Sequence, residues 1–368
     1  MTPPKRRSLA GLGLSALAVA VAGSRAGAAN GPFRTEIVVR TVRNLRTPAK
    51  VAAFVGMAAR HRVAVINVAA KQDEDDEVPS GTVFYNSAIA PRAAGYETFD
   101  ALRSTIEEAH RHGIRVRAWI PQFHDQVASR RGAEWRMTVQ KAERGKPRAG
   151  GDKGDFFVNP LNADVQAYER SIVEEIVRTY DVDGIVLDWL RFDDYNMDLS
   201  AGTRKNFKAT FGYDPIAIDF ATDNPQRAQW NAWRTAAIAD YVGSVRRAID
   251  AIKPGLELGV YILPPEFDEV GQDSGQFAQY VSFVAPLLYF TDWGYPLSWV
   301  STNVLPQTRA KANGTRVIPT LDTDWSDAAY AVILGDIRAK FPEITTLSWF
   351  VYGAWREATL ERIDKIRG

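Results

Sequence analysis

The chain has 368 residues, carries 45 Lys and Arg against 44 Asp and Glu, and contains no cysteine. The balanced charge gives no general attraction to nucleic acid or to an acidic membrane surface, so any partner must be recognised locally. The missing cysteines exclude disulfides, thiolate metal sites and a cysteine nucleophile. The length suits one large α/β domain, because α/β barrels run past roughly 250 residues as a single unit.

The first 28 residues have the pattern of an export signal. The basic segment Lys5-Arg6-Arg7 precedes an apolar run over residues 9–22, and Ala26-Gly27-Ala28 supplies the small residues of a cleavage site. The apolar run is too short to span a bilayer, which argues against stable membrane insertion. The sequence therefore predicts a signal peptide over residues 1–28 and an exported protein, periplasmic or extracellular. Either the general secretory or the twin-arginine route fits the paired arginines.

From residue 35 onward the sequence repeats one unit, a short apolar strand followed by polar or aromatic residues and an amphipathic helix. Thr47-Pro48 has the cap and first-turn arrangement of a helix start, and Gly113 marks a helix end. Strands are predicted at 35–41, 63–69, 114–120, 184–187, 256–262, 283–290, 316–321 and 345–351. Helices are predicted at 49–60, 99–112, 162–180, 204–211, 225–252 and 357–366.

The strand predicted at 184–187 is the central element of the predicted fold. Its short apolar run, rich in β-branched residues, is bounded by charged residues, which is typical of a strand buried on both faces. The helix predicted at 162–180 leads into it, so the pair forms one step of a βα repeat. Such repeats carry their chemistry at the carboxyl ends of the strands, which makes Asp188 the first candidate catalytic residue.

Eight strand and helix units predict an α/β fold, a (β/α)8 or TIM barrel over residues 33–368, and no Gly-, Ser- or Pro-rich linker divides it. In such a barrel all strand ends share one mouth. The carboxylates expected there are the acidic run 73–76, Asp188, Glu266, Asp268, Asp292, Asp322 and Asp324. Of these, the candidate catalytic residues are Asp188, Asp292, Asp324, Asp322 and Glu266. The residues expected to bind substrate beside them are Arg191, His124, Trp189, Tyr289, Trp293, Trp325 and Trp349. Carboxyls with flat aromatic faces suit a glycosidase, which needs one carboxyl as acid and another as nucleophile or base.

Several of these residues have ordinary structural alternatives. Asp188 can cap the following turn or pair with Arg191, and Trp189 and Trp349 can belong to the core. The acidic run 73–77 is typical of a solvated loop and lacks the ligand spacing of a calcium site. The four histidines form no recognisable ligand pair, so we predict neither a metal nor another cofactor.

Two motifs carry a family resemblance. The run from Phe157 to Tyr168 and the run from Tyr180 to Phe192 resemble the signature of bacterial glycoside hydrolase-like barrels. That group includes the hydrolase-like domain of proteins that process poly-N-acetylglucosamine exopolysaccharide. Weaker similarity covers residues 107–119, 134–135 and 284–289, so the resemblance extends over most of the chain after residue 37. It implies a (β/α)8 barrel that acts on glycosidic bonds, with the Asp of the Asp-x-x-Arg-Phe motif, here Asp188, as the main catalytic residue.

The second carboxylate does not follow from the resemblance. The chain has Val281-Ser282 where relatives often carry an Asp entering the sixth strand, and its seventh strand ends in Asp322-Thr-Asp324 rather than in a neutral amide. Arg191 is expected to favour the charged form of Asp188, which suits a nucleophile or base. The acid is then a carboxyl whose pKa is raised by an aromatic neighbour, and Asp292 and Asp324, each followed by a Trp, rank first.

The sequence therefore predicts an exported glycoside hydrolase that cleaves glycosidic bonds in a bacterial polysaccharide, using Asp188 and a second carboxylate. The alternative is a catalytically silent barrel that binds envelope glycan or assists its export. The expected partner is a polysaccharide or oligosaccharide, with no nucleic acid. The identity of the glycan, endo or exo action, retaining or inverting stereochemistry and the oligomeric state stay open at this point.

Overall fold

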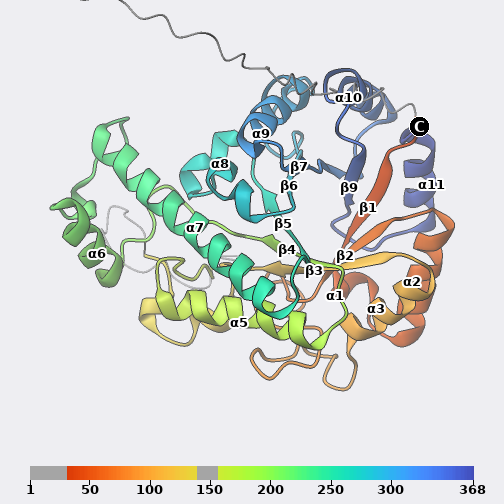
Figure 1. The fold of residues 1–368 in the computed structure, drawn as a ribbon, viewed down its shortest axis with the longest axis horizontal. Coiled ribbons are helices and arrows are strands. Elements are labelled where there is room, and N and C mark those ends of the chain that lie inside the picture. The colour runs from red at the N-terminus through yellow and green to blue at the C-terminus, as the bar shows by residue number, and fades with distance from the viewer. Residues whose placement is uncertain (1–30, 139–155) are drawn as a thin grey trace, which may run out of the picture.

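The computed structural model describes residues 31–138 and 156–368, so the predicted signal peptide over 1–28 lies outside the described residues. These residues form one curled sheet of parallel strands with helices packed around its outside (Figure 1). The strand order is β7-β6-β5-β4-β3-β2-β1-β9-β8. The strands are β1 Arg34–Val39, β2 Val65–Ala69, β3 Arg115–Pro121, β4 Gly184–Asp188, β5 Glu257–Ile262, β6 Phe283–Pro286, β7 Arg316–Val317, β8 Thr320–Asp322 and β9 Thr346–Phe350. The expected α/β class and parallel strand order are confirmed.

Nine strands replace the predicted eight because the seventh is interrupted. Its first part, β7, pairs with β6, whereas its second part, β8, pairs with β9. Pro319 lies between the two parts and has no N–H to donate to a neighbouring strand. The N–H of Ile318 donates to Val284 O at 2.9 Å, and the N–H of Leu288 donates to Thr320 O at 3.0 Å. The first bond joins β6 to the residue after β7, and the second joins the segment after β6 to β8, so the two ends of the curled sheet lie close together.

Helices follow most strands, and several of them start at polar caps. The side chains of Thr47, Asn162 and Asn224 each accept a backbone N–H from the first turn of the helix that follows. The helices are α1 Thr41–Asn44, α2 Pro48–Arg60, α3 Ala101–Arg111, α4 Gln126–Ser129, α5 Ala163–Thr179, α6 Ala201–Phe211, α7 Pro225–Ile252, α8 Ser274–Phe277, α9 Leu305–Ala312, α10 Asp327–Lys340 and α11 Glu357–Ile366. Neither α9 nor α10 was among the predicted helices. In the described part of the chain, no helix is both long and apolar enough to cross a membrane.

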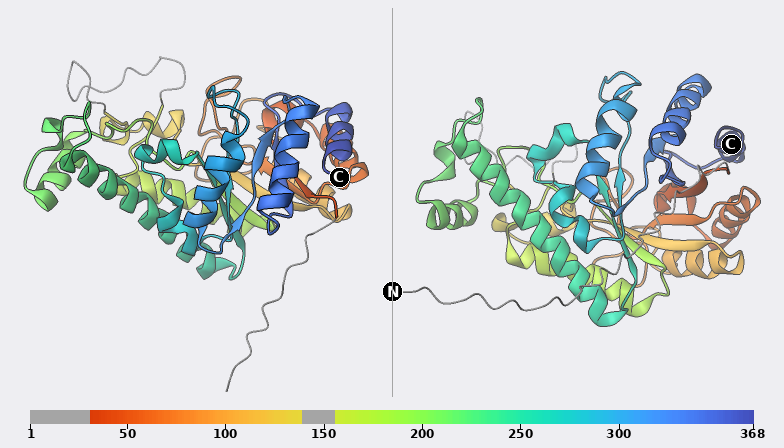
Figure 2. Two further views of the ribbon diagram at one scale, coloured as in Figure 1. Left: turned by 90° about the horizontal axis from the view of Figure 1, so that it is seen from above. Right: turned by 45° about the horizontal axis from the view of Figure 1, so that its top comes forward.

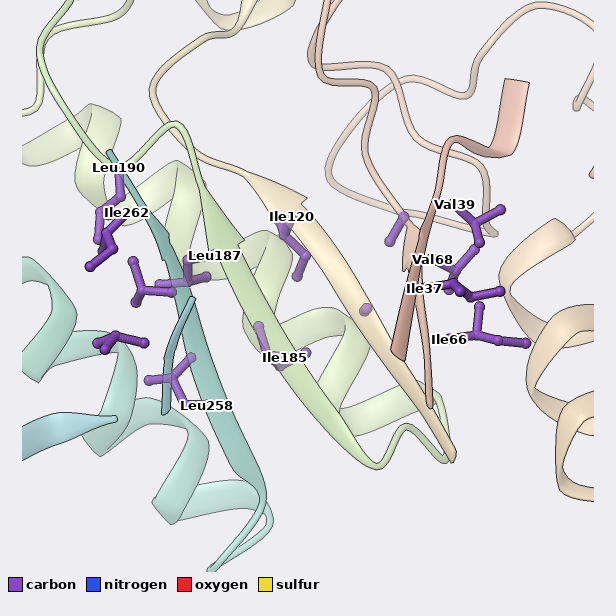
Figure 3. Packing of buried hydrophobic residues seen from close by; sticks show 14 of the residues in the cluster. Ile37, Val39, Ile66, Val68, Ile120, Ile185, Leu187, Leu190, Leu258 and Ile262 are labelled. Carbon is purple, nitrogen blue, oxygen red and sulfur yellow. The ribbon is translucent and has the colours of Figure 1, made fainter. Parts of the chain in front are cut away.

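The core has an outer layer and an inner layer. Along β4, Ile185 and Leu187 point outward to the helices, and Figure 3 shows them with aliphatic side chains from the neighbouring strands. Val186 points inward, where it packs with Trp119 and Tyr261. The prediction that this strand is buried on both faces is confirmed, since all of its first four residues are buried.

The amino-terminal end of the sheet interior is closed by ion pairs. Arg117, on β3, is 1% exposed. Its Nη1 lies 2.6 Å from Glu36 Oε2, and its Nε lies 3.0 Å from Glu257 Oε2. The guanidinium also covers the ring of Phe283 at 4.5 Å. This plug leaves the carboxyl-terminal end of the interior as the side that can receive a ligand.

A helical extension projects from one side of the sheet. It consists of α6 and the first half of α7, at the left of Figure 1 and again in both views of Figure 2. Phe207 and Trp230 are buried in a small apolar cluster of its own, with ring centroids 5.3 Å apart. The extension lies on the opposite side of the molecule from α2, α3 and α11.

Candidate active site

Asp188, the last residue of β4, stands at the centre of the site. Alternation along the strand places it on the inward face with Val186. Trp119 lies opposite Val186 on β3, and its indole Nε1 donates to Asp188 Oδ2 at 2.9 Å. The backbone N–H of Trp189 donates to Asp188 Oδ1 at 2.7 Å. Both oxygens of the carboxylate therefore accept a hydrogen bond, which favours its ionised form.

The backbone turns sharply at Trp189, which has a positive φ of 49°. This region is sparsely populated for bulky residues, and residues held there tend to cluster at functional sites. The turn stacks the Trp189 indole on the ring of His124, with centroids 4.6 Å apart. His124 is 2% exposed, and its Nδ1 lies 2.7 Å from the carbonyl oxygen of Asp73. The buried imidazole therefore supports the indole of Trp189.

Burial and the surrounding groups act on Asp188 in opposite directions. Burial raises the pKa of the carboxyl to about 6, against hydrogen bonds from Trp189 and Trp119 and the charge of Arg191, all of which lower it. The expected influence of Arg191 is thus present, but burial outweighs it. Above pH 6 the group is still mostly ionised.

Arg191 sits against aromatic rings beside this carboxyl. Its guanidinium lies over Trp189 at 4.7 Å and over Phe157 at 5.1 Å, and Nη1 donates to the carbonyl oxygen of Phe192 at 3.1 Å. Burial lowers the pKa of Arg191 to about 10, so the group remains a cation at neutral pH. Its position next to Asp188 suits a residue that orients the carboxylate or contacts a ligand hydroxyl.

The loop after β2 brings more carboxyls to the same place. Asp73 and Glu74 both line the cavity in front of Asp188. The charge of Glu74 is among the causes that raise the pKa of Asp188. Burial raises the pKa of Asp73 to about 7, against the opposing charge of Arg40.

The acidic run 73–77 is only in part the solvated loop expected from the sequence, since Asp76 and Glu77 are exposed but Asp73 is buried. Arg40 follows β1 and is 1% exposed; its Nη2 lies 3.0 Å from Asp73 Oδ1, 3.0 Å from Asp76 Oδ2 and 3.6 Å from Glu74 Oε2. Two further arginines, Arg43 and Arg46, form ion pairs with Glu77. Basic residues that follow the neighbouring strand therefore fix this loop, because the ends of β1 and β2 lie side by side.

Tyr352, from the loop after β9, completes this side of the cavity. Its hydroxyl donates a hydrogen bond to Glu74, and its ring lies under the guanidinium of Arg40 at 4.9 Å. The side chain is 57% exposed, which is unusual for a ring that lines a cavity. Glu74 is thus held between a cation and a phenol.

The remaining walls of the cavity are mostly aromatic. The cavity has a volume of about 360 Å³, in the lower part of the range for ligand sites. The ring centroids of Trp293 and Tyr289 are 5.8 Å apart, and those of Tyr289 and Phe350 are 5.9 Å apart. The lining residues from the strand interior and the loops include Val38, Trp119, Tyr261, Gln272, Tyr289, Asp292, Trp293, Thr320 and Phe350. Flat faces around carboxyls form an environment suited to sugar rings.

Six of the twelve predicted site residues meet at the cavity, and six do not. Those that line it are Asp188, Trp189, Arg191, Tyr289, Asp292 and Trp293. Those outside the lining are His124, Glu266, Asp322, Asp324, Trp325 and Trp349.

Trp325 and Trp349 were expected to bind substrate, but both lie outside the cavity lining. Trp325 is 3% exposed and packs on Phe290 and Tyr330, with ring centroids at 4.7 and 5.4 Å. Trp349 is fully buried and pairs in register with Ile37 and Leu321, on the outward face of the sheet. The two-residue period of β9 sends its neighbour Phe350 toward the cavity instead.

Two of the three outlying carboxyls have local partners. Glu266 accepts hydrogen bonds from Trp299 Nε1, at 2.5 Å, and from Asn303. The Asp322 carboxylate accepts the backbone N–H of Asp324 at 3.1 Å, so it caps its own loop, and burial raises its pKa. Asp324 is exposed. The expectation that Asp324 ranks level with Asp292 is therefore not supported by the arrangement of the cavity.

Among residues 31–138 and 156–368, no group of three or more His, Asp or Glu side chains is arranged to hold a metal ion. The sequence placed Asp73 and Glu74 at the mouth but did not count them among the site residues, and it missed Tyr352. The signals for the first two were their position after a predicted strand and the presence of Arg40, Arg43 and Arg46 after the strand before it. Tyr352 offered no local signal beyond being aromatic.

Comparison with known sequences links the chain to glycoside hydrolases. A family profile described as glycosyl hydrolase-like 10 matches residues 76–296, a region that includes Asp188 and Arg191. Glycosyl hydrolase DigH from Escherichia coli K12 is 30% identical over 198 residues, which are 50% of this chain and 42% of that protein. The match therefore spans less than half of the length of that relative.

Comparison with solved structures agrees on the fold. The glycoside hydrolase domain of PgaB (BpsB) from Bordetella bronchiseptica aligns with a TM-score of 0.70 at 14% identity, over 92% of this chain and 98% of that chain. Alpha-L-fucosidase isoenzyme 2 from Paenibacillus thiaminolyticus aligns with a TM-score of 0.62 at 19% identity, over 92% of this chain and 49% of that chain. At these identities the likeness establishes the fold alone, a TIM-barrel-like α/β fold found in glycoside hydrolases.

The resemblance carried by the motif around Asp188 is thus confirmed by an independent profile that covers more than half of the sequence. The chain belongs to the glycosyl hydrolase-like 10 family.

Proposed function

We propose that this chain is an exported glycoside hydrolase that cleaves glycosidic bonds in a bacterial polysaccharide, with Asp188 as one of two essential carboxyls. The observation that carries the proposal is the setting of Asp188. It lies at the inner end of a cavity walled by aromatic rings, its two oxygens accept N–H groups, and a second carboxyl, Glu74, faces the same space. Two carboxyls that flank one sugar-sized space are the minimum that glycoside hydrolysis requires.

Asp188 takes the role of nucleophile or general base. With a pKa of about 6 it is mostly ionised at neutral pH, and the N–H groups of Trp119 and Trp189 hold it in one orientation. A general acid must instead hold a proton at the working pH. Asp188 is poorly suited to that second task above its own pKa.

Glu74 takes the role of the second carboxyl. It lines the cavity, its charge acts on Asp188, and Tyr352 and Arg40 fix its position. Asp292 also lines the cavity but is exposed, which makes it the next choice for this role. The proposal thus places the second carboxyl at Glu74 rather than at Asp292 or Asp324, which the sequence suggested.

The substrate is a polymer outside the cytoplasm. The export pattern of residues 1–28 supports this location, and the family and fold support a glycan. The cavity takes a short part of the chain, with Trp293 and Tyr289 as platforms for sugar rings. Mass spectrometry of the protein purified from its native host tests export, and we expect the mature chain to start after Ala28.

Hydrolysis is tested with the purified protein on a panel of bacterial exopolysaccharides and cell-wall glycans, followed by the release of reducing ends. Asp188→Asn and Glu74→Gln should each lower kcat by roughly two to four orders of magnitude while glycan binding survives. Asp324→Asn is the matched control, since it removes an exposed carboxyl in the loop after β8 that does not line the cavity, and it should keep wild-type activity.

The outcomes separate the roles. Full activity of Asp188→Asn would refute the assignment of that residue. If Glu74→Gln kept full activity and Asp292→Asn lost it, Asp292 would be the second catalytic carboxyl. Binding of a glycan by the wild-type protein without any hydrolysis across the panel would favour the silent glycan-binding barrel.

A further inference from the structure

A second hollow lies beside the cavity, between α2 and the loop that leads into α11. Its volume is about 470 Å³. Phe54, Met57 and Trp355 form an apolar floor, each less than 10% exposed. The rim is basic. The cationic residues that line it are Arg43, Arg46, Lys50, Arg60 and Arg356, and the only acidic one is Glu357. We call this hollow the basic groove.

Part of this positive charge has no counterion in the protein. Arg43 and Arg46 pair with Glu77, and Arg60 pairs with Glu357 at 2.6 Å. Lys50 and Arg356 are exposed and form no ion pair with any residue in the described ranges 31–138 and 156–368. Their charges are therefore available to a ligand anion. Because the net charge of the whole chain is only +1, this excess is a local feature.

The basic groove and the cavity share a wall. Trp355 lies in the groove floor, and its indole N–H donates to the carbonyl oxygen of Val38 at 2.8 Å. Val38 in turn lines the cavity. Tyr352, which lines the cavity, precedes Trp355 by three residues in the same loop. One end of this loop thus contacts Glu74 through the exposed Tyr352, and its other end lines the groove through Trp355.

We propose that the basic groove is a second glycan-binding site, which holds a carboxylate-bearing part of an acidic polysaccharide while another part of the same chain occupies the cavity at Asp188. The inference rests on the proposed function and adds the chemical class of the substrate. Lys50 and Arg356 bind a ligand carboxylate directly, and Arg46, with a half-exposed side chain, is the third cation within the same rim. The chain passes over the ring of Tyr352.

An acidic glycan fits this arrangement better than the alternatives. A neutral glycan gains nothing from two exposed cations that lack counterions. A nucleic acid usually requires a broad basic surface, because its affinity comes from many phosphate contacts, whereas here two unpaired cations stand above an apolar floor. Widely spaced carboxylates on a sugar chain match a small number of cations.

The test is a direct binding measurement on the full mature chain, so that it does not depend on catalysis. Fluorescently labelled oligosaccharides of polygalacturonate, hyaluronan and alginate serve as acidic probes, and a dextran oligosaccharide of equal length is the neutral probe. We expect at least one acidic probe to bind and the dextran to bind more weakly. The double variant K50Q/R356Q should lose about fivefold to thirtyfold in affinity, from two exposed ionic contacts.

The double variant K205Q/K208Q is the matched control. It removes the same charge from exposed positions of α6, on the opposite side of the molecule from α2, and should bind like the wild type. The conservative variant K50R/R356K should retain most of the affinity. Thermal unfolding of each variant checks that the fold is intact.

Several results would overturn the proposal. These are no binding of any acidic probe, equal losses in K50Q/R356Q and K205Q/K208Q, or a single-stranded DNA of equal charge that binds more tightly than every acidic glycan. Failure of the proposed function is a separate result, since Asp188→Asn abolishes hydrolysis but should leave binding in the groove unchanged.

Discussion

The indole N–H of Trp119 and the carboxylate of Asp188 form a hydrogen bond of 2.9 Å between adjacent strands. The two residues are far apart in sequence, and the register of β3 against β4 brings them together. The bond stabilises the ionised form of a carboxyl whose burial favours the neutral form. The pKa of about 6 is the balance of these two influences, and it sets the pH range in which Asp188 can act as a base.

Trp119→Phe should test this balance. The change keeps an aromatic ring but removes the N–H, so the pKa of Asp188 should rise by about one unit, the scale of one hydrogen bond to a charged group. The acidic limb of the pH profile of kcat/KM should move upward by the same amount. Trp293→Phe keeps its ring in the cavity wall and should leave the limb in place. An unchanged limb in Trp119→Phe would mean that Asp188 does not control the profile.

Trp293 and Trp325 should respond differently to truncation, although each follows an Asp near a strand end. Trp293→Ala should weaken oligosaccharide binding by about 1 to 3 kcal/mol and leave the fold intact, since the ring lines the cavity. Trp325→Ala should instead reduce the free energy of unfolding by about 3 to 5 kcal/mol, because its buried ring contacts Phe290 and Tyr330. Isothermal titration and urea unfolding measure the two effects. The reverse pattern would place Trp325 at the glycan.

Ionisation of Asp188 should destabilise the fold as the pH rises. The unfolded chain releases this proton near the usual value of 3.8, whereas the folded protein releases it near 6. The contribution of the group is therefore favourable below about pH 4 and is lost as the pH rises to about 6, by at most ~3 kcal/mol. Relative to Asp188→Asn, which cannot ionise, the wild type should lose unfolding free energy between pH 4 and pH 7.5.

The control for that experiment is Asp181→Asn. Asp181 is exposed and a hydrogen bond from Lys253 lowers its pKa, so its contribution has the opposite sign. The wild type should not lose stability relative to Asp181→Asn over the same pH range. If the difference in unfolding free energy changed with pH in the same way in both comparisons, the effect would not belong to Asp188.

Lys71→Met should strongly destabilise the protein. Lys71 is fully buried, and its Nζ lies 2.7 Å from Asp125 Oδ2 and 2.6 Å from Glu169 Oε2. Without the cation two buried carboxyls face each other, and we expect a loss of about 3 to 5 kcal/mol in the free energy of unfolding. Lys253→Met, which breaks an exposed ion pair with Asp181, should cost less than about 1 kcal/mol. Urea unfolding at neutral pH measures both, and equal losses would contradict a special role for Lys71.

Local patterns in the sequence determined much of the backbone, although α9, α10 and the division of the seventh strand were not predicted. The apolar run ending at Asp188 could satisfy its backbone groups and bury both faces only as an internal strand, and β4 has these properties. Helix starts were equally local, since the side chains of Thr47, Asn162 and Asn224 reach N–H groups within three residues. Periodicity and capping involve neighbours in the chain, so they can be read without the fold.

The tertiary structure decided which side chains meet. Trp349 and Phe350 are neighbours, and the register of β9 alone sends the first to the helices and the second to the cavity. Glu74 became a cavity residue because Arg40, from the preceding strand end, fixes the acidic run in place. Such pairings depend on strand order and register, which arise from packing across the whole sheet. The sequence therefore determined the strand that carries Asp188, and only the fold decided that Glu74 and Tyr352 stand beside it.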